Sequence, residues 1–175
     1  MNGNKKFPLP VNKRLHALMG TRDELSHNLK SFYKIKVKEV MERDFLKFKR
    51  QNDLLDLLRE FKDPKITSAV IVDEENHLLG LVTQKSLLKF FKMPQRGAIF
   101  GTSILERIKT SRSSLMKDIM TEDPVTIEEN ETLDEAIRLM IETGKHHLPV
   151  LNRDKKVEGV LETGDIMILL RIVTL

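Results

Sequence analysis

The stretch that decides the fold reads MKDIMTEDPVTIEENETLDEAIRLMIETGKHHLPVLNRDKKVEGVLETGDIMILLR, residues 116–171. Residues 124–127 follow an Asp-Pro turn and are rich in β-branched side chains, a composition typical of a strand. Residues 148–151 and 157–161 are two further apolar runs separated by a polar turn, and this arrangement predicts two more strands. The stretch therefore contains three predicted strands.

A helix between the first and second of these strands is marked at both of its ends. Thr132 and Glu135 form a Ser/Thr-x-x-Glu capping box, in which the hydroxyl accepts from one unpaired N–H and the carboxylate from another. Gly144 ends the helix, because glycine adopts a left-handed conformation at little cost. A second helix begins near Asp165, after the last strand. The predicted order is strand, helix, strand, strand, helix.

The chain contains a second copy of this pattern. When the sequence is shifted by 79 residues, Met120 falls on Met41 and Gly159 falls on Gly80. No gap is needed anywhere in residues 37–91. Internal repetition on this scale indicates two similar structural units in one chain.

The repeated segments resemble the CBS domain family. In the second copy the resemblance rests on residues 117–121, 146–150 and 159–166, and in the first copy on residues 38–41 and 80–87. The resemblance implies an α+β fold. Two tandem β-α-β-β-α CBS repeats are expected to pack about a pseudo-two-fold axis, with extra helices at the N-terminus.

We expect four segments along the chain. They are an N-terminal helical segment at residues 1–35, a first repeat at 36–91, a linker with a short helix at 92–114, and a second repeat at 115–175. The names first repeat and second repeat are kept for these two ranges below.

The N-terminal segment and the linker carry helix signals of their own. Capping boxes begin at Thr21 and at Ser103. An apolar stripe at helical spacing follows the first of them, and we expect it to pack on the first repeat or on a second subunit. Its members are Leu25, Leu29, Phe32 and Tyr33.

Charge is distributed unevenly over the chain, which carries a formal net charge of +4. Residues 1–36 carry a net +6 and residues 88–115 a net +5, whereas residues 116–175 carry a net −6. The favoured interpretation is that basic flanks pair with acidic repeats, within the chain or across a dimer. The alternative is that the basic segments bind nucleic acid, with Lys5, Lys6, Lys13 and Arg14 as candidate contacts.

Composition excludes several classes of protein. The chain has no cysteine, so disulfides and thiolate chemistry are absent. No apolar run approaches the roughly 18 residues that a membrane helix needs, and the first residues lack a signal-peptide core. A phosphate loop, a dinucleotide-binding motif and a nucleophile–base pair are not recognisable either. We therefore expect a cytoplasmic protein that is not an enzyme.

Candidate ligand-binding residues follow from the resemblance, which implies two clefts for adenosine-containing ligands. An Asp after the Gly-containing strand, here Asp165, would accept from the ribose hydroxyls, and a Ser or Thr three residues earlier would meet phosphate. The residues that would flank the base in the second cleft are Thr126, His146, His147, Leu148 and Pro149. Adjacent histidines on a strand point to opposite faces, so this pair is not expected to hold one metal ion.

Each repeat carries only half of this polar pair. The first has Thr83 but Ser86 in place of the Asp, and the second has Asp165 but Glu162 in place of the Ser or Thr. Two unit charges about 4 Å apart repel by about 1–4 kcal/mol, depending on screening, so Glu162 disfavours a nearby phosphate. The second site is therefore expected to hold an adenosine or S-adenosylmethionine-like ligand, or a nucleotide whose phosphates turn away. The other reading is that Thr83 and Asp165 simply begin helices.

Together these features predict a regulatory module that senses AMP, ADP, ATP or S-adenosylmethionine and signals to an unidentified partner protein. A homodimer is expected. Two other interpretations stay open at this level: a ligand-free structural or dimerisation module, and a nucleic-acid-binding protein that uses the basic N-terminal segment and linker.

Overall fold

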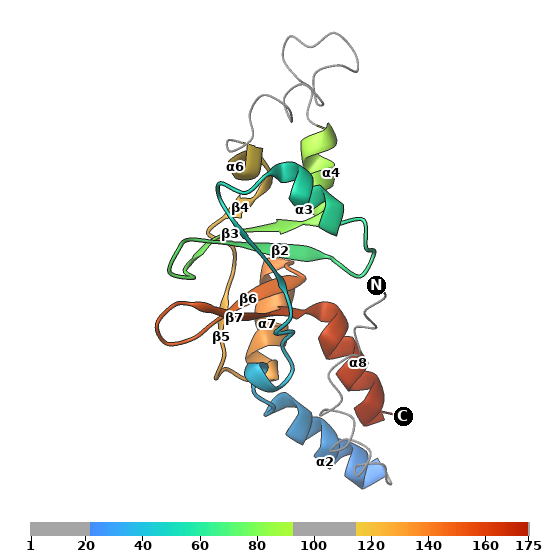
Figure 1. Ribbon diagram of the computed structural model, residues 1–175. Coiled ribbons are helices and arrows are strands. Elements are labelled where there is room, and N and C mark those ends of the chain that lie inside the picture. The colour runs from blue at the N-terminus through green and yellow to red at the C-terminus, as the bar shows by residue number, and fades with distance from the viewer. Residues whose placement is uncertain (1–21, 93–114, 175) are drawn as a thin grey trace, which may run out of the picture.

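A computed structural model describes residues 22–92 and 115–174 (Figure 1). The first repeat forms strand β1, helix α3, strands β2 and β3, and helix α4. Their bounds are Leu46–Lys49, Leu54–Glu60, Ser68–Val72, Leu78–Thr83 and Gln84–Lys92. This is the predicted β-α-β-β-α order. The part of the predicted N-terminal helical segment before Arg22, the predicted helix at Ser103 and the basic residues from Lys5 to Arg14 lie outside the described residues.

The second repeat forms the same series of elements, β5, α7, β6, β7 and α8. Their bounds are Ile127–Glu128, Leu133–Thr143, His147–Leu151, Val157–Glu162 and Thr163–Thr174. The predicted α+β fold with two tandem repeats is therefore confirmed. The strand predicted at residues 124–127 starts only at Ile127 and continues to Glu128. Pro124 has no N–H to donate to a ladder, which excludes that residue from pairing as a donor.

Four further elements precede or join the repeats. Helix α2 (Arg22–Tyr33) and the short 3-10 helix η2 (Val37–Glu39) precede β1, while helix α6 (Leu115–Ile119) and strand β4 (Thr121–Glu122) precede β5. In Figure 1 the sheet that contains β2, β3 and β4 lies above the sheet that contains β5, β6 and β7, with α3, α4 and α6 at one end of the molecule and α2 and α8 at the other. No helix within these described ranges combines the length and apolar character needed to cross a membrane.

The two sheets share one pairing scheme. In the order β1-β2-β3-β4, β1 runs parallel to β2, and each later pair is antiparallel. In the order β5-β6-β7, β5 runs parallel to β6, and β6 runs antiparallel to β7. Side chains from both sheets meet in a buried apolar layer. It is formed by Val70, Val72 and Leu81 of the first repeat and by Leu151, Val157 and Val160 of the second.

The repeats also exchange their first segments, a feature that the sequence did not predict. Strand β4 belongs to the second repeat, yet it pairs with β3 of the first, where Leu81 lies opposite Thr121. Reciprocally, Glu42 of the first repeat pairs with Val160 of β7 through backbone hydrogen bonds of 2.9 and 3.0 Å. Each sheet is therefore extended by residues of the other repeat.

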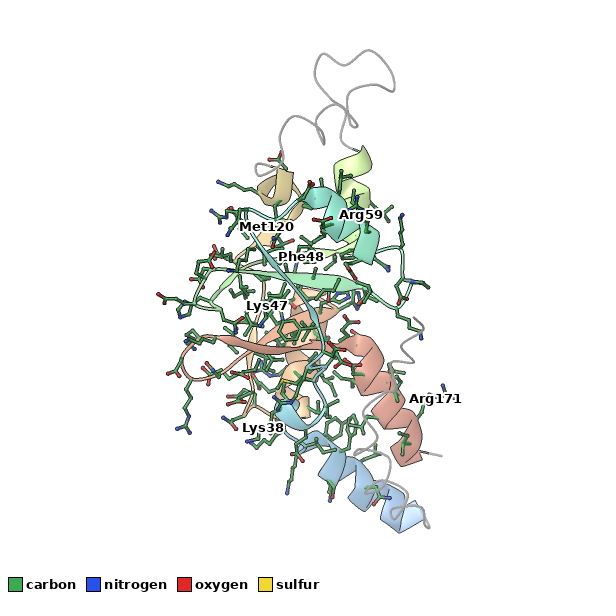
Figure 2. The ribbon with its side chains drawn as sticks, viewed as in Figure 1. Lys38, Lys47, Phe48, Arg59, Met120 and Arg171 are labelled. Atoms are coloured by element: carbon green, nitrogen blue, oxygen red, sulfur yellow. The ribbon has the colours of Figure 1, made fainter. Side chains whose placement is uncertain are left out.

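A methionine beside each exchanged segment packs on a glycine of the opposite repeat. A Cβ atom added at Gly159 would lie 2.7 Å from the Met41 Sδ atom, and one added at Gly80 would lie 2.8 Å from the Met120 Sδ atom. Met120 thereby joins the core of the first repeat, where it lies near Phe48 (Figure 2). The two glycines are required because a side chain at either position would collide with the other repeat.

The helix boundaries follow from local hydrogen bonds. The Thr132 hydroxyl accepts from the Glu135 N–H at 3.3 Å, and Asp53 accepts from the Leu55 N–H at 2.9 Å at the start of α3. The Glu135 carboxylate, predicted to complete a capping box, pairs with Arg138. Gly144 ends α7 with a left-handed φ of 63°, as predicted.

The N-terminal helix packs on the second repeat, and not on the first as the sequence suggested. Helix α2 contacts α8 and α7, and Phe32 is 2% exposed within the core of the second repeat. Backbone hydrogen bonds of 2.9 Å from Leu133 N to Ile35 O and from Val37 N to Glu131 O fix this position. The cause is the segment exchange, which carries the chain after α2 across to the second repeat.

Candidate functional site

Polar side chains gather where four strands begin or end. Strand β2 begins at Ser68, which lies opposite Thr83 at the end of β3. Strand β6 begins at His147, which lies opposite Glu162 at the end of β7. The first pair belongs to the first repeat and the second pair to the second repeat. Because the two sheets face each other across their shared apolar layer, the two pairs meet at one edge of the interface.

Glu162 joins the two pairs. Its Oε1 atom accepts a hydrogen bond from the Ser68 hydroxyl at 3.0 Å and another from the Thr67 hydroxyl. The His147 Nε2 atom lies 3.8 Å from the same oxygen. A carboxylate of the second repeat is therefore held by two hydroxyls of the first. We call Thr67, Ser68, His147 and Glu162 the inter-repeat polar cluster.

Asp165 lies beside this cluster in the first turn of α8. Its Oδ2 atom accepts a hydrogen bond from the Glu162 N–H at 2.9 Å. Burial raises the pKa of the Asp165 carboxyl to about 6, the Glu162 N–H opposes this shift, and the Glu162 and Glu42 carboxylates add to it. Asp165 consequently keeps its proton to a higher pH than an ordinary aspartate does.

The two adjacent histidines have different surroundings. Burial lowers the pKa of His147, opposed by the charge of Glu162, while the neighbouring His146 lowers it further. His146 is exposed, and its Nδ1 atom lies 3.3 Å from the Thr163 hydroxyl. Among the described residues, no group of three or more His, Asp or Glu side chains is arranged to hold a metal ion.

The corresponding residues of the first repeat bind each other. The Ser86 hydroxyl accepts from the Thr83 N–H at 2.9 Å, and the Ser86 N–H donates to the Thr83 hydroxyl at 3.2 Å. Ser86 therefore caps the start of α4 as Asp165 caps the start of α8. This is the helix-starting role that the sequence left open for Thr83 and Asp165. After capping, a carboxylate still has more unused hydrogen-bond acceptor positions for a ligand than a hydroxyl has.

The remaining predicted site residues lie along β6 and before β5. Leu148 is fully buried in the core of the second repeat, and Pro149 is buried opposite Val160. Thr126 is half-buried and directly precedes Ile127 of β5. The structure thus brings Glu162, Asp165 and His147 together, whereas Leu148 points into the core.

Sequence reasoning missed two members of the cluster, Thr67 and Ser68. The signal was present, because the shift of 79 residues places these two residues on His146 and His147, which were already candidates. Glu42 was also missed. Its proximity to Asp165 arises from the segment exchange, which leaves no local trace in the sequence.

Two interlocked repeats with a polar cluster at their interface define a tandem α+β module. The chain belongs to the CBS domain family, because the family's sequence model matches residues 37–92 and 116–172.

Several curated relatives are similar to this chain. Protein MJ1426 of Methanocaldococcus jannaschii is 21% identical over an alignment of 149 residues, and the match covers 75% of this chain and 88% of that protein. YlbB of Bacillus subtilis is 29% identical over 132 residues, 75% of this chain and 79% of YlbB. The chloroplastic CBSX1 of Arabidopsis thaliana is 26% identical over 129 residues, and the match covers 66% of this chain and 53% of CBSX1.

Solved structures share the fold. The CBS domain pair of MJ0100, solved with 5-methylthioadenosine and S-adenosylmethionine, has a TM-score of 0.61 at 19% identity and covers 78% of this chain and 99% of that one. CBSX2 of Arabidopsis thaliana, solved with AMP, has a TM-score of 0.62 at 23% identity and covers 80% of this chain and 98% of that one. These similarities establish the architecture.

Proposed function

We propose that this protein is a regulatory module that binds an adenosine-containing ligand (AMP, ADP, ATP or S-adenosylmethionine) beside Asp165 and signals to a partner protein. The carrying observation is the half-buried Asp165 carboxylate at the start of α8, next to the polar ends of strands from both repeats. The ligands of the MJ0100 pair and of CBSX2, all of which contain adenosine, support this choice of class.

Asp165 has spare capacity for a ribose. An ionised carboxylate offers about four acceptor positions, and one Asp165 oxygen accepts the Glu162 N–H. Two adjacent ribose hydroxyls can donate to the remaining positions as charge-assisted hydrogen bonds, each contributing about 1.5–3 kcal/mol. In the first repeat, the Ser86 hydroxyl donates to the Thr83 backbone carbonyl, and Ser86 carries no charge. The first site is therefore expected to bind the ligand more weakly or to stay empty.

The test is isothermal titration of the full chain with adenosine, AMP, ADP, ATP and S-adenosylmethionine. We expect at least one of them to bind, and Asp165→Ala to weaken it about tenfold or more. Asp165→Asn keeps an acceptor for the Glu162 N–H but loses the charge, so it separates ligand binding from helix capping.

Ser86→Ala is the matched control, since it removes the equivalent cap from the first repeat. It is expected to leave the affinity of the second site unchanged. If Asp165→Ala binds every compound as tightly as the unchanged protein, the assignment of Asp165 is wrong.

A ligand-free dimerisation module is the second candidate, favoured by a different observation. Leu88 and Met167 occupy equivalent positions on α4 and α8, and they are 71% and 50% exposed. A homodimer that covered both positions would remove this apolar surface from water. A chain that binds none of the five compounds but sediments as a dimer would favour this candidate over the ligand-sensing one.

A further inference from the structure

We propose that the hydroxyls of Thr67 and Ser68 form an anion-binding pair that the Glu162 carboxylate occupies from within the protein, in competition with a phosphate group. The proposal rests on the proposed function for the nature of the whole ligand. The competition itself concerns only an anion, so it can be measured with inorganic phosphate.

The contacts are those of an occupied anion site. Ser68 is 9% exposed, and a hydroxyl at that depth requires a hydrogen-bond partner. Glu162 supplies the acceptor for Ser68, at 3.0 Å, and for the adjacent Thr67. Both donors come from the first repeat and the acceptor from the second, so the interaction forms only when the repeats are packed together.

The surroundings act on this acceptor in both directions, because the neighbouring Asp165 carboxylate repels a second negative charge whereas the start of α8 attracts one. Glu162 directly precedes the 12-residue helix α8, whose N-terminal N–H groups carry partial positive charge. His147 Nε2 lies 3.8 Å from the carboxylate and adds attraction when it is protonated. Phosphate and carboxylate oxygens accept from hydroxyls in the same way, but their charges repel, so only one of them can hold the pair.

The first repeat has a neutral residue where the second has Glu162. Thr83 is the counterpart of Glu162, and it lies opposite Ser68 in the β2–β3 ladder with a neutral hydroxyl. A phosphate at Thr67 and Ser68 competes directly with the Glu162 carboxylate that reaches over from the second repeat, while the Asp165 carboxylate beside Glu162 adds further negative charge to the site.

Because of this competition, the presence or absence of a phosphate on the ligand would decide whether the Glu162 hydrogen bonds between the repeats are kept. A ligand that places a phosphate on Thr67 and Ser68 must displace Glu162 and break a hydrogen-bonded link between the two repeats. A ligand without phosphate, such as a nucleoside or a sulfonium compound, leaves that link in place. The module would thus respond differently to two ligands that share the same adenosine.

Phosphate-dependent stability of the full chain tests the anion site directly. Melting temperatures are compared in phosphate and in chloride at equal ionic strength and pH 7, for the unchanged protein and for Glu162→Ala. We expect phosphate to raise the melting temperature of Glu162→Ala by about 2–4 °C more than that of the unchanged protein, because the vacated hydroxyls gain an acceptor.

Two controls make the result specific. Glu158→Ala removes the same charge from the same strand, where Glu158 accepts from Asn152 at 2.7 Å, and it should show no added response to phosphate. Adding Thr67→Val and Ser68→Ala to Glu162→Ala should abolish the response. The proposal is overturned if Glu162→Ala responds no more than Glu158→Ala, or if the response survives removal of both hydroxyls.

Titration with AMP and adenosine then separates this inference from the proposed function. We expect the affinity for AMP relative to adenosine to rise about tenfold or more in Glu162→Ala. An unchanged ratio overturns the link between the anion site and the ligand. If none of adenosine, AMP, ADP, ATP and S-adenosylmethionine binds the unchanged protein, the proposed function fails, while the phosphate measurement still decides whether the hydroxyl pair is an anion site.

Discussion

The first and second repeats are alike in their turns and different at their strand ends. In the β2–β3 turn, Asp73 accepts from the N–H groups of residues 75 and 77 at 2.9 and 2.8 Å. In the β6–β7 turn, Asn152 accepts from those of residues 154 and 156 at 2.9 and 3.0 Å. Even the left-handed residues correspond, since Asn76 has a φ of 74° and Lys155 a φ of 60°.

The differences that bear on the site lie at the ends of β3 and β7 and in the first turns of α4 and α8. Thr83 and Ser86 satisfy each other in the first repeat, whereas Glu162 reaches into the other repeat and Asp165 sits half-buried with a raised pKa. Either set can begin a helix. We infer that turns, caps and buried apolar residues set the shared frame, and that the repeats differ chemically in the charge of two polar positions.

The largest expected effect tests whether the repeats are one folding unit. Leu54 and Leu133 are equivalent first residues of α3 and α7, 1% and 0% exposed. Replacing either one with alanine should lower the free energy of unfolding by about 2–5 kcal/mol. Each core contains a methionine from the opposite repeat, so both variants should still unfold in a single transition.

Urea denaturation, followed by tyrosine fluorescence and by circular dichroism, measures the free energy of unfolding and the number of transitions. The only tyrosine of the chain, Tyr33, is 42% exposed on α2, the helix that packs on the second repeat, and there is no tryptophan, so tyrosine fluorescence reports on that helix. Far-ultraviolet circular dichroism reports on both halves. If Leu54→Ala shifts the dichroism midpoint but leaves the fluorescence midpoint in place, the repeats unfold separately and the segment exchange does not couple them.

A smaller effect is expected from the glycines at the exchanged segments. Alanine at Gly159 would place Cβ 2.8 Å from the Glu42 carbonyl oxygen, and alanine at Gly80 would place it 3.0 Å from the Thr121 carbonyl oxygen. Overpacking of this kind lowers stability by about 1–3 kcal/mol. Because its backbone contact is shorter, Gly159→Ala should be the more damaging of the two.

Gly164→Ala is the control for this pair. A Cβ atom added at Gly164 has no other atom within 4 Å. The stability of this variant in the same urea experiment should therefore stay close to that of the unchanged protein. Equal stability of Gly159→Ala and Gly164→Ala would mean that the close approach of the two repeats at Gly159 is relieved at no cost.

The frame of each repeat could be predicted because its signals are local. Asp53 and Thr132 accept from the N–H groups of their helices, and Gly144 adopts the expected left-handed conformation. The segment exchange could not be predicted, since a two-residue strand such as β4 has no periodicity to detect. The apolar stripe on α2 was recognised because it has helical periodicity. The repeat that covers the stripe was not predicted, because its identity depends on the segment exchange.

The candidate site was predicted only in part. Asp165, Glu162 and His147 follow from the resemblance and lie together in the structure. The hydroxyls of Thr67 and Ser68 bind Glu162 only because the two sheets face each other in one particular way. That arrangement is set by packing between distant segments, which a pattern within either repeat does not encode.

The smallest expected effect concerns the charge of Asp165 and has a defined sign. Its carboxyl has a pKa of about 6 in the folded protein, against an ordinary value of 3.8. Between these two values the folded state binds more protons than the unfolded state. The contribution of Asp165 to stability is therefore full below about pH 4 and is lost as the pH rises through 6.

Asp165→Asn lacks this titration, so the comparison isolates it. The free energy of unfolding of the unchanged protein, relative to that of the variant, should fall between pH 4 and pH 7. The change should be smaller than in either preceding experiment because water reaches the half-buried carboxyl and screens its neighbours. His147 is present in both proteins, so its own titration largely cancels in the difference. If the difference in free energy of unfolding does not change over this range, Asp165 is ionised and well solvated. Asp165 and Ser86 would then differ only as two kinds of helix cap.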